Sequence, residues 1–116
     1  YLNRLADAIR AAGVPPILHI CGNLKRVEHL VTQLRFAALS TDAMINLAAL
    51  KRDHPGLVTM GNLSTYALEF TDADRIRDMT RNLVRSGIDI LSPACGLSTS
   101  TRIDALRAFT DTVRNN

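Results

Sequence analysis

Apolar residues occur in two different patterns along the chain. Four short apolar runs show no alternation with polar residues, which predicts strands buried on both faces, as in a parallel sheet. These runs cover residues 15–21, 36–40, 57–60 and 88–91. Elsewhere apolar residues recur every three to four positions, which predicts amphipathic helices. The helical segments cover residues 2–13, 23–34, 43–52, 71–87 and 101–113.

These segments form a helix followed by four strand–helix units. The alternation predicts an α/β fold with a parallel sheet and right-handed crossovers. The short repeat suits a parallel (βα)4 unit, half of a TIM-type (βα)8 barrel, and we expect residues 1–116 to form that single domain. A flavodoxin-like or Rossmann sheet is the alternative. It would normally carry a glycine-rich phosphate-binding loop after a strand, and the sequence has none.

Three of the predicted helices start with residues typical of N-caps. Asn23 can cap the helix that follows it. Thr71 with Asp74, and Thr101 with Asp104, resemble capping boxes. We expect these residues to mark the points where the helices begin.

Polar residues follow each predicted strand, at the end where the chain leaves the sheet. The strands of a parallel sheet all end on the same side, and functional residues of barrels collect there. These residues are therefore the candidates for a shared site: His19, Cys21, Ser40, Asp42, Asn62, Ser64 and Cys95.

A histidine and two cysteines within this set suggest a metal site. His19 and Cys21 lie two positions apart on an extended segment, so their side chains point to the same face. With Cys95 they offer one imidazole and two thiolates, a set that suits zinc and leaves one tetrahedral position open, as catalytic sites do. The alternative is two buried cysteines and a hydrogen-bonded histidine. His29 and His54 are interpreted as surface residues.

Composition narrows the classes of partner. No apolar stretch approaches the roughly 20 residues that span a membrane, so we expect no membrane segment. The net charge is +3, but the Lys and Arg residues are scattered and aromatic residues are few, which argues against nucleic-acid binding. We expect a cytoplasmic protein, in which two cysteines favour metal binding or catalysis over a disulfide.

The start of the sequence suggests a piece of a longer chain. Tyr1 stands inside a helical pattern, and no initiator methionine precedes it. A sheet of four strands also has two unpaired edges, which are a liability for a free monomer. We therefore expect either a missing N-terminal half-barrel or self-association of half-barrels.

The motifs "ILHICGN", "LSTD", "GNLS" and "GIDILSPACGL" resemble the C-terminal part of the uroporphyrinogen decarboxylase superfamily. Within it, they are most similar to zinc-dependent corrinoid methyltransferases of the methylcobamide:coenzyme M type. The resemblance implies a (βα)8 barrel with zinc at its mouth. His19, Cys21 and Cys95 match the zinc ligands, Asp42 matches a catalytic acidic position and Asn62 a pocket position.

The resemblance implies that a methyl group moves from a methylated corrinoid, free or on a corrinoid protein, to a zinc-activated thiol such as coenzyme M. Ser40, Asn62 and Ser64 are the expected substrate contacts. Thr65 stands where the family commonly has proline, which bears on substrate preference. Decarboxylation is disfavoured, because true uroporphyrinogen decarboxylases lack this zinc set.

Two alternatives remain open. One is methyl transfer from a folate to homocysteine, because cobalamin-independent methionine synthase also has an HxC motif and a later "CGL". The other is a non-catalytic half-barrel that binds zinc without turnover.

Overall fold

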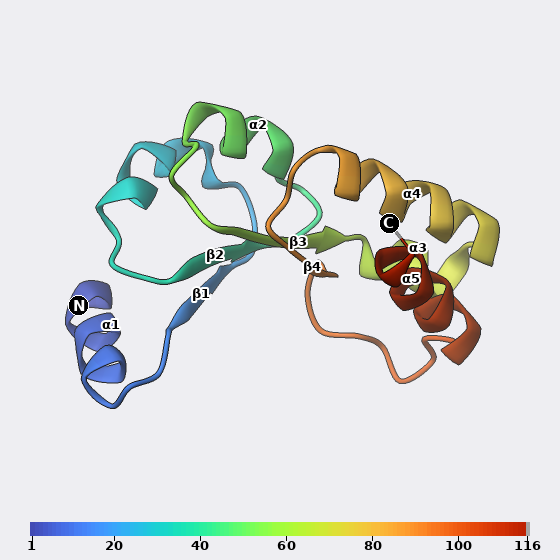
Figure 1. Ribbon diagram of the computed structural model, residues 1–116, viewed down its shortest axis with the longest axis horizontal. Helices are drawn as coiled ribbons and strands as arrows, with labels where there is room; N and C mark the ends of the chain where they lie inside the picture. Colours follow the sequence, from blue (N-terminus) through green and yellow to red (C-terminus); the bar gives the residue numbers. More distant parts are fainter. Residues whose placement is uncertain (116) are drawn as a thin grey trace.

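A four-stranded sheet with flanking helices makes up residues 1–115, the part of the chain that the computed structural model describes (Figure 1). Its elements in order are α1 (Leu2–Ala11), β1 (Ile17–Ile20), the 3-10 helices η1 (Leu24–Arg26) and η2 (Glu28–Gln33), β2 (Ala38–Thr41), α2 (Leu47–Asp53), β3 (Thr59–Leu63), α3 (Thr65–Phe70), α4 (Ala73–Arg85), β4 (Ile90–Pro93) and α5 (Ile103–Arg114).

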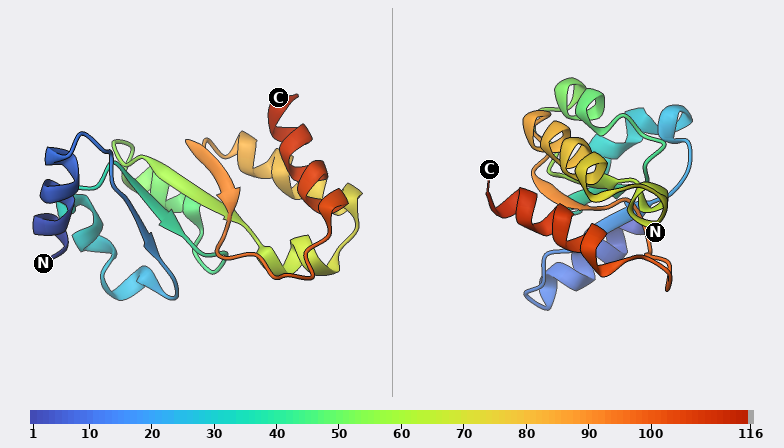
Figure 2. Two further views of the ribbon diagram at one scale, coloured as in Figure 1. Left: turned by 90° about the horizontal axis from the view of Figure 1, so that it is seen from below. Right: turned by 90° about the vertical axis from the view of Figure 1, so that its right-hand side faces the viewer.

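The sheet has the strand order β1-β2-β3-β4, and every neighbouring pair is parallel. This confirms the predicted α/β fold of four strand–helix units. A doubly wound sheet would reverse its strand order at a switch point, so the sequential order also excludes the Rossmann alternative. The carboxyl ends of the strands point toward one edge of the molecule, the lower edge in the left panel of Figure 2.

The two faces of the sheet differ in their covering. In Figure 1, α2 and α4 lie above the sheet, and we call this the outer face. Leu18 and Leu39 belong to the core that lies there. On the opposite, inner face, Ile17 is 48% exposed and Ile90 is 38% exposed. The prediction that all strands are buried on both faces is therefore wrong for β1 and β4, whereas all four residues of β2 are buried.

The core consists of two clusters, one on the outer face of the sheet and one at the end of β3 (Figure 1). One joins η1, η2 and α2 to the strands through Leu24, Val31, Leu39, Leu47, Leu50 and Ile88. The other joins α3, α4 and α5 to the end of β3 through Leu63, Ala67, Leu68, Ile76, Ala105, Ala108 and Phe109. Leu83 and Leu91 pack against both clusters, so the two halves of the core are continuous.

A polar network ties α2 to the start of β3 and β4. The Asp89 carboxylate accepts hydrogen bonds from the Thr59 N–H at 2.7 Å and from the Lys51 ammonium at 2.9 and 3.0 Å. The Thr59 hydroxyl donates to the same carboxylate at 2.8 Å. Partial burial raises the pKa of Asp89, but these donors outweigh it and hold the pKa at about 2.

Several local predictions differ from the structure. Residues 24–33 form two short 3-10 helices instead of one α-helix, although Asn23 caps the first as expected. The N-cap of α4 is Asp72 rather than Thr71, and α5 begins after Arg102 without a side-chain cap. Helix α3 was not predicted.

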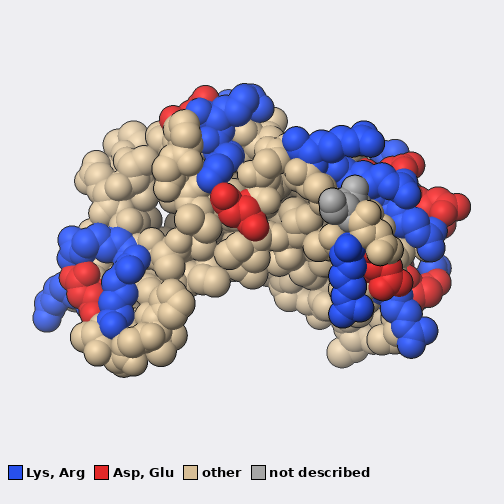
Figure 3. Space-filling view, in the orientation of Figure 1, with Lys and Arg blue, Asp and Glu red and all other residues tan. Residues whose placement is uncertain are grey.

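Charged side chains gather over the helices. In Figure 3 they cover α1 on one side and α4 and α5 on the other, while the hollowed lower middle of the molecule is uncharged in this view. None of the helices in residues 1–115 combines the length and the apolar character needed to cross a membrane.

Candidate metal centre

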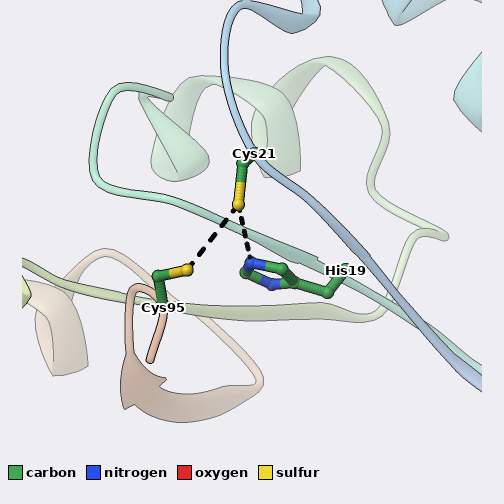
Figure 4. Close-up of side chains that lie close together, drawn as sticks. All are labelled: His19, Cys21 and Cys95. Atoms are coloured by element: carbon green, nitrogen blue, oxygen red, sulfur yellow. Dashed lines mark hydrogen bonds between the residues drawn. The ribbon is translucent and has the colours of Figure 1, made fainter. Parts of the chain in front are cut away.

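Three side chains that were predicted as metal ligands converge at the carboxyl edge of the sheet (Figure 4). The His19 Nε2 atom lies 3.2 Å from the Cys21 Sγ atom, and that sulfur lies 3.7 Å from the Cys95 Sγ atom. All three donor atoms lie within 4.8 Å of one another. The side chains are solvent-exposed, and both cysteines are free thiols.

The fold explains why these residues meet. His19 lies on β1 and Cys21 directly follows it, so alternation along the extended backbone places both side chains on one face. Cys95 follows β4, at the other edge of the sheet. Four flat strands at about 4.8 Å spacing would hold these edges about 14 Å apart. Curvature of the sheet and the segment after β4 close this gap.

Two of the three donor separations are close to those around a tetrahedral zinc ion. With Zn–S bonds of about 2.3 Å and a Zn–N bond of about 2.0 Å, two thiolates lie about 3.8 Å apart, and a thiolate and an imidazole nitrogen about 3.5 Å apart. The observed separations are 3.7 Å and 3.2 Å. One histidine and two cysteines also form a donor set typical of zinc. The third pair, His19 and Cys95, lies within 4.8 Å, so the three side chains are placed to share one ion.

The thiol of Cys21 is more basic than an ordinary cysteine. Its hydrogen bond with Cys95 raises the pKa of Cys21, as do slight desolvation by neighbouring atoms and the negative charges of Cys95 and Asp42. In the absence of a metal, the proton is therefore held on this sulfur at neutral pH.

The histidine has a hydrogen-bond partner on the neighbouring strand. The His19 Nδ1 atom lies 2.9 Å from the Ser40 Oγ atom, and Ser40 is 5% exposed. The serine hydroxyl, which was predicted as a substrate contact, therefore lies against a predicted metal ligand.

Asp42 lies next to the centre and contacts the backbone around it. One carboxylate oxygen accepts the Gly22 N–H at 2.6 Å, and the other accepts the Met44 N–H at 3.0 Å. This clamps the turn after Cys21 to the loop after β2. Asp42 is not one of the three grouped donors, and its catalytic role stays a prediction.

Asn62 and Ser64 support the neighbouring loops. The Asn62 amide donates to the Asp42 and Ile45 carbonyls, both at 2.8 Å. The Ser64 hydroxyl accepts the Ala67 N–H and caps α3. These contacts are structural, and the substrate-binding roles predicted for both residues stay predictions.

The other two histidines lie outside the centre. His29 is exposed, and the Nε2 atom of His54 is 4.0 Å from a carboxylate oxygen of Glu28. Within residues 1–115, His19, Cys21 and Cys95 are the only group of three such donors.

A cavity on the inner face of the sheet reaches the centre. Its volume is about 530 Å³. His19, Ser40 and Cys95 line it beside apolar side chains that include Met60 and Leu97. A small molecule in this cavity would have access to two of the three grouped donors.

Comparison with known proteins places the chain in a family. The family profile of uroporphyrinogen decarboxylase (URO-D) matches residues 1–116. The chain belongs to this family. A solved structure titled methyltransferase from Methanosarcina mazei superposes with a TM-score of 0.85 at 25% identity, over 97% of this chain and 34% of that one. The fold is thus that of a fragment of a methyltransferase TIM barrel.

Curated relatives include two types of methyltransferase and a decarboxylase. The methylcobamide:CoM methyltransferase MtbA of Methanosarcina acetivorans is 22% identical over 99% of this chain and 34% of its own length. MtaA of Methanosarcina barkeri is 30% identical over 80% and 28%. A uroporphyrinogen decarboxylase from Anaeromyxobacter is 26% identical over 97% and 33%. The chain thus spans about a third of the length of these relatives.

Proposed function

We propose that this chain carries the zinc centre of a methyltransferase that moves a methyl group from a methylated corrinoid to a small thiol. The observation that supports the proposal most strongly is the convergence of three donor atoms within 4.8 Å at the carboxyl edge of the sheet. Three protein ligands leave a fourth tetrahedral position for a substrate, which is the arrangement of catalytic zinc sites.

Some residues of the site bind the metal, and others orient the backbone around it. His19, Cys21 and Cys95 hold the metal, and Asp42 fixes the turn that follows Cys21 through its bond to the Gly22 N–H. When bound, zinc would lower the pKa of the acceptor thiol so that its thiolate exists at neutral pH. The cavity of about 530 Å³ beside His19 and Cys95 gives the thiol room to approach.

The overall reaction balances without a further reagent. The acceptor thiol releases its proton to solvent, a sulfur–carbon bond forms and the cobalt–carbon bond of the methylated corrinoid breaks. The electron pair of the broken bond stays on cobalt, so the products are a thioether and a reduced corrinoid. The likeness to relatives named methylcobamide:CoM methyltransferases favours a corrinoid donor and coenzyme M as acceptor.

Decarboxylation and folate-dependent transfer receive less support. A pair of thiols beside an imidazole is a metal-binding set, which the decarboxylation of a porphyrinogen does not require. The names of two methyltransferase relatives also specify a methylcobamide, which favours a corrinoid donor over a folate.

The test is methyl transfer from methylcobalamin to coenzyme M by the zinc-loaded protein, followed through the visible absorbance of the corrinoid. We expect thiol-dependent loss of methylcobalamin in the wild type and none with Cys95→Ser. Homocysteine and a methylated folate serve as the competing pair. Transfer only with that pair, or equal rates in wild type and Cys95→Ser, would contradict the proposal.

A further inference from the structure

Ser40 occupies the position that controls the orientation of the histidine ligand. In the register of the sheet, Ser40 on β2 pairs with His19 on β1. Paired residues on neighbouring parallel strands project to the same face. The Ser40 hydroxyl therefore stands beside the imidazole ring, with Oγ 2.9 Å from Nδ1.

The two nitrogens of this ring face different groups. Nδ1 meets the hydroxyl of Ser40, while Nε2 lies 3.2 Å from the Cys21 sulfur. A neutral imidazole carries its proton on only one nitrogen and offers a lone pair at the other. With the proton on Nδ1 donated to Ser40 Oγ, the lone pair on Nε2 is directed toward the two cysteines.

We propose that Ser40 is a positioning residue of the metal centre, which fixes the tautomer and ring orientation of His19 and so strengthens metal binding. This inference rests on the metal centre of the proposed function but not on the methyl transfer itself. Hydrogen-bond partners of metal-bound histidines act in this way, and their loss typically weakens metal binding by about 10–100-fold.

The serine side of this hydrogen bond is sheltered, whereas the histidine side is exposed. Ser40 is 5% exposed and lies in a strand whose four residues are all buried, while His19 is solvent-exposed and both residues line the same cavity. Without the hydroxyl, water can reach the ring nitrogen, but a mobile water does not hold the ring in one orientation. Ser40→Ala would therefore leave the Nδ1–H of His19 without this acceptor.

The sequence offers a matched control on the same face of the sheet. Ser92 lines the same cavity as Ser40, but its hydroxyl donates to the Pro93 carbonyl at 3.0 Å. Ser92→Ala thus removes a serine hydroxyl from the same cavity without touching the histidine ligand. Ser40→Thr is the conservative variant, because it keeps a hydroxyl on the same strand.

The experiment measures zinc affinity by competition with a chromophoric chelator, together with thermal unfolding of the metal-free proteins. We expect Ser40→Ala to bind zinc about 10–100-fold more weakly. Ser40→Thr and Ser92→Ala should stay within about threefold of the wild type. A Ser40→Ala protein with wild-type zinc affinity and a raised KM for the thiol would make Ser40 a substrate contact and overturn the inference.

A second measurement needs only the wild-type protein. In the zinc-loaded, 15N-labelled chain, NMR should show that His19 binds zinc through Nε2 and that its Nδ1 proton exchanges slowly with water. Binding through Nδ1, or a rapidly exchanging Nδ1 proton, would overturn the inference even if Ser40→Ala does not fold. A wild-type protein that does not bind zinc would overturn the metal centre itself. A Ser40→Ala protein with unchanged zinc affinity would overturn only the role of Ser40.

Discussion

The pH dependence of stability should report directly on Asp89. Its carboxylate binds the Thr59 N–H and the Lys51 ammonium, and its pKa is lowered from the ordinary value of 3.8 to about 2. A shift of this size corresponds to roughly 2 kcal/mol of stabilisation. The side chain is 34% exposed, so solvent screening reduces the expected contribution to about 1–2 kcal/mol.

The sign follows from the direction of the shift. The folded state holds the charged carboxylate more strongly than the unfolded state, so the contribution is complete above the unfolded pKa near 4. It is lost as the pH falls through the folded pKa of about 2. About half of it should be gone by pH 3.

The assay compares urea unfolding of wild type and Asp89→Asn at pH 7, 4 and 3. At pH 7, we expect the variant to be about 1–2 kcal/mol less stable, and we expect this difference to shrink as the pH falls. Asp78→Asn is the control, since Asp78 forms an exposed ion pair with Arg81 on α4 and should change stability by less than about 0.5 kcal/mol. A wild-type advantage that stays constant from pH 7 to pH 3 would contradict a stabilising role for the Asp89 carboxylate.

Four further substitutions test the centre and the backbone of the sheet. Cys21→Ser and Cys95→Ser should each abolish stoichiometric zinc in metal analysis, because a hydroxyl replaces a thiolate poorly, and full zinc content in either would remove that residue from the site. Asp42→Asn should keep zinc but lower the methyl-transfer rate, because its carboxylate binds backbone N–H groups; a zinc-free variant would make Asp42 a ligand. Gly61→Ala should destabilise by about 1–3 kcal/mol in urea unfolding, since φ is +141° and the added Cβ would lie 3.1 Å from the Thr41 carbonyl oxygen; unchanged stability would contradict this.

Periodicity was sufficient to predict the order of the four strands, but it missed helix α3 between β3 and α4. It overestimated the burial of Ile17 and Ile90, since an apolar run does not reveal which strands lie at an edge of the sheet. It also assigned residues 24–33 to an α-helix, because a short apolar repeat does not separate an α-helix from successive 3-10 turns.

The grouping of His19, Cys21 and Cys95 could be predicted from the sequence, whereas the contacts around them could not. The sequence alone shows that His19 and Cys21 lie two positions apart in a predicted strand. It also shows a cysteine after the last predicted strand. The hydrogen bond between His19 and Ser40 depends on the register of β1 and β2, which no local pattern specifies. The backbone contacts of Asp42 likewise depend on how two loops meet in space.

Metal analysis combined with cobalt substitution tests the central claim most directly. We expect one zinc per chain in freshly purified, reduced protein. We also expect the visible spectrum of the cobalt-substituted form to shift when coenzyme M or homocysteine is added, because the open position accepts a thiol. Absence of metal, or a cobalt spectrum that does not respond to either thiol, would contradict a catalytic centre built from His19, Cys21 and Cys95.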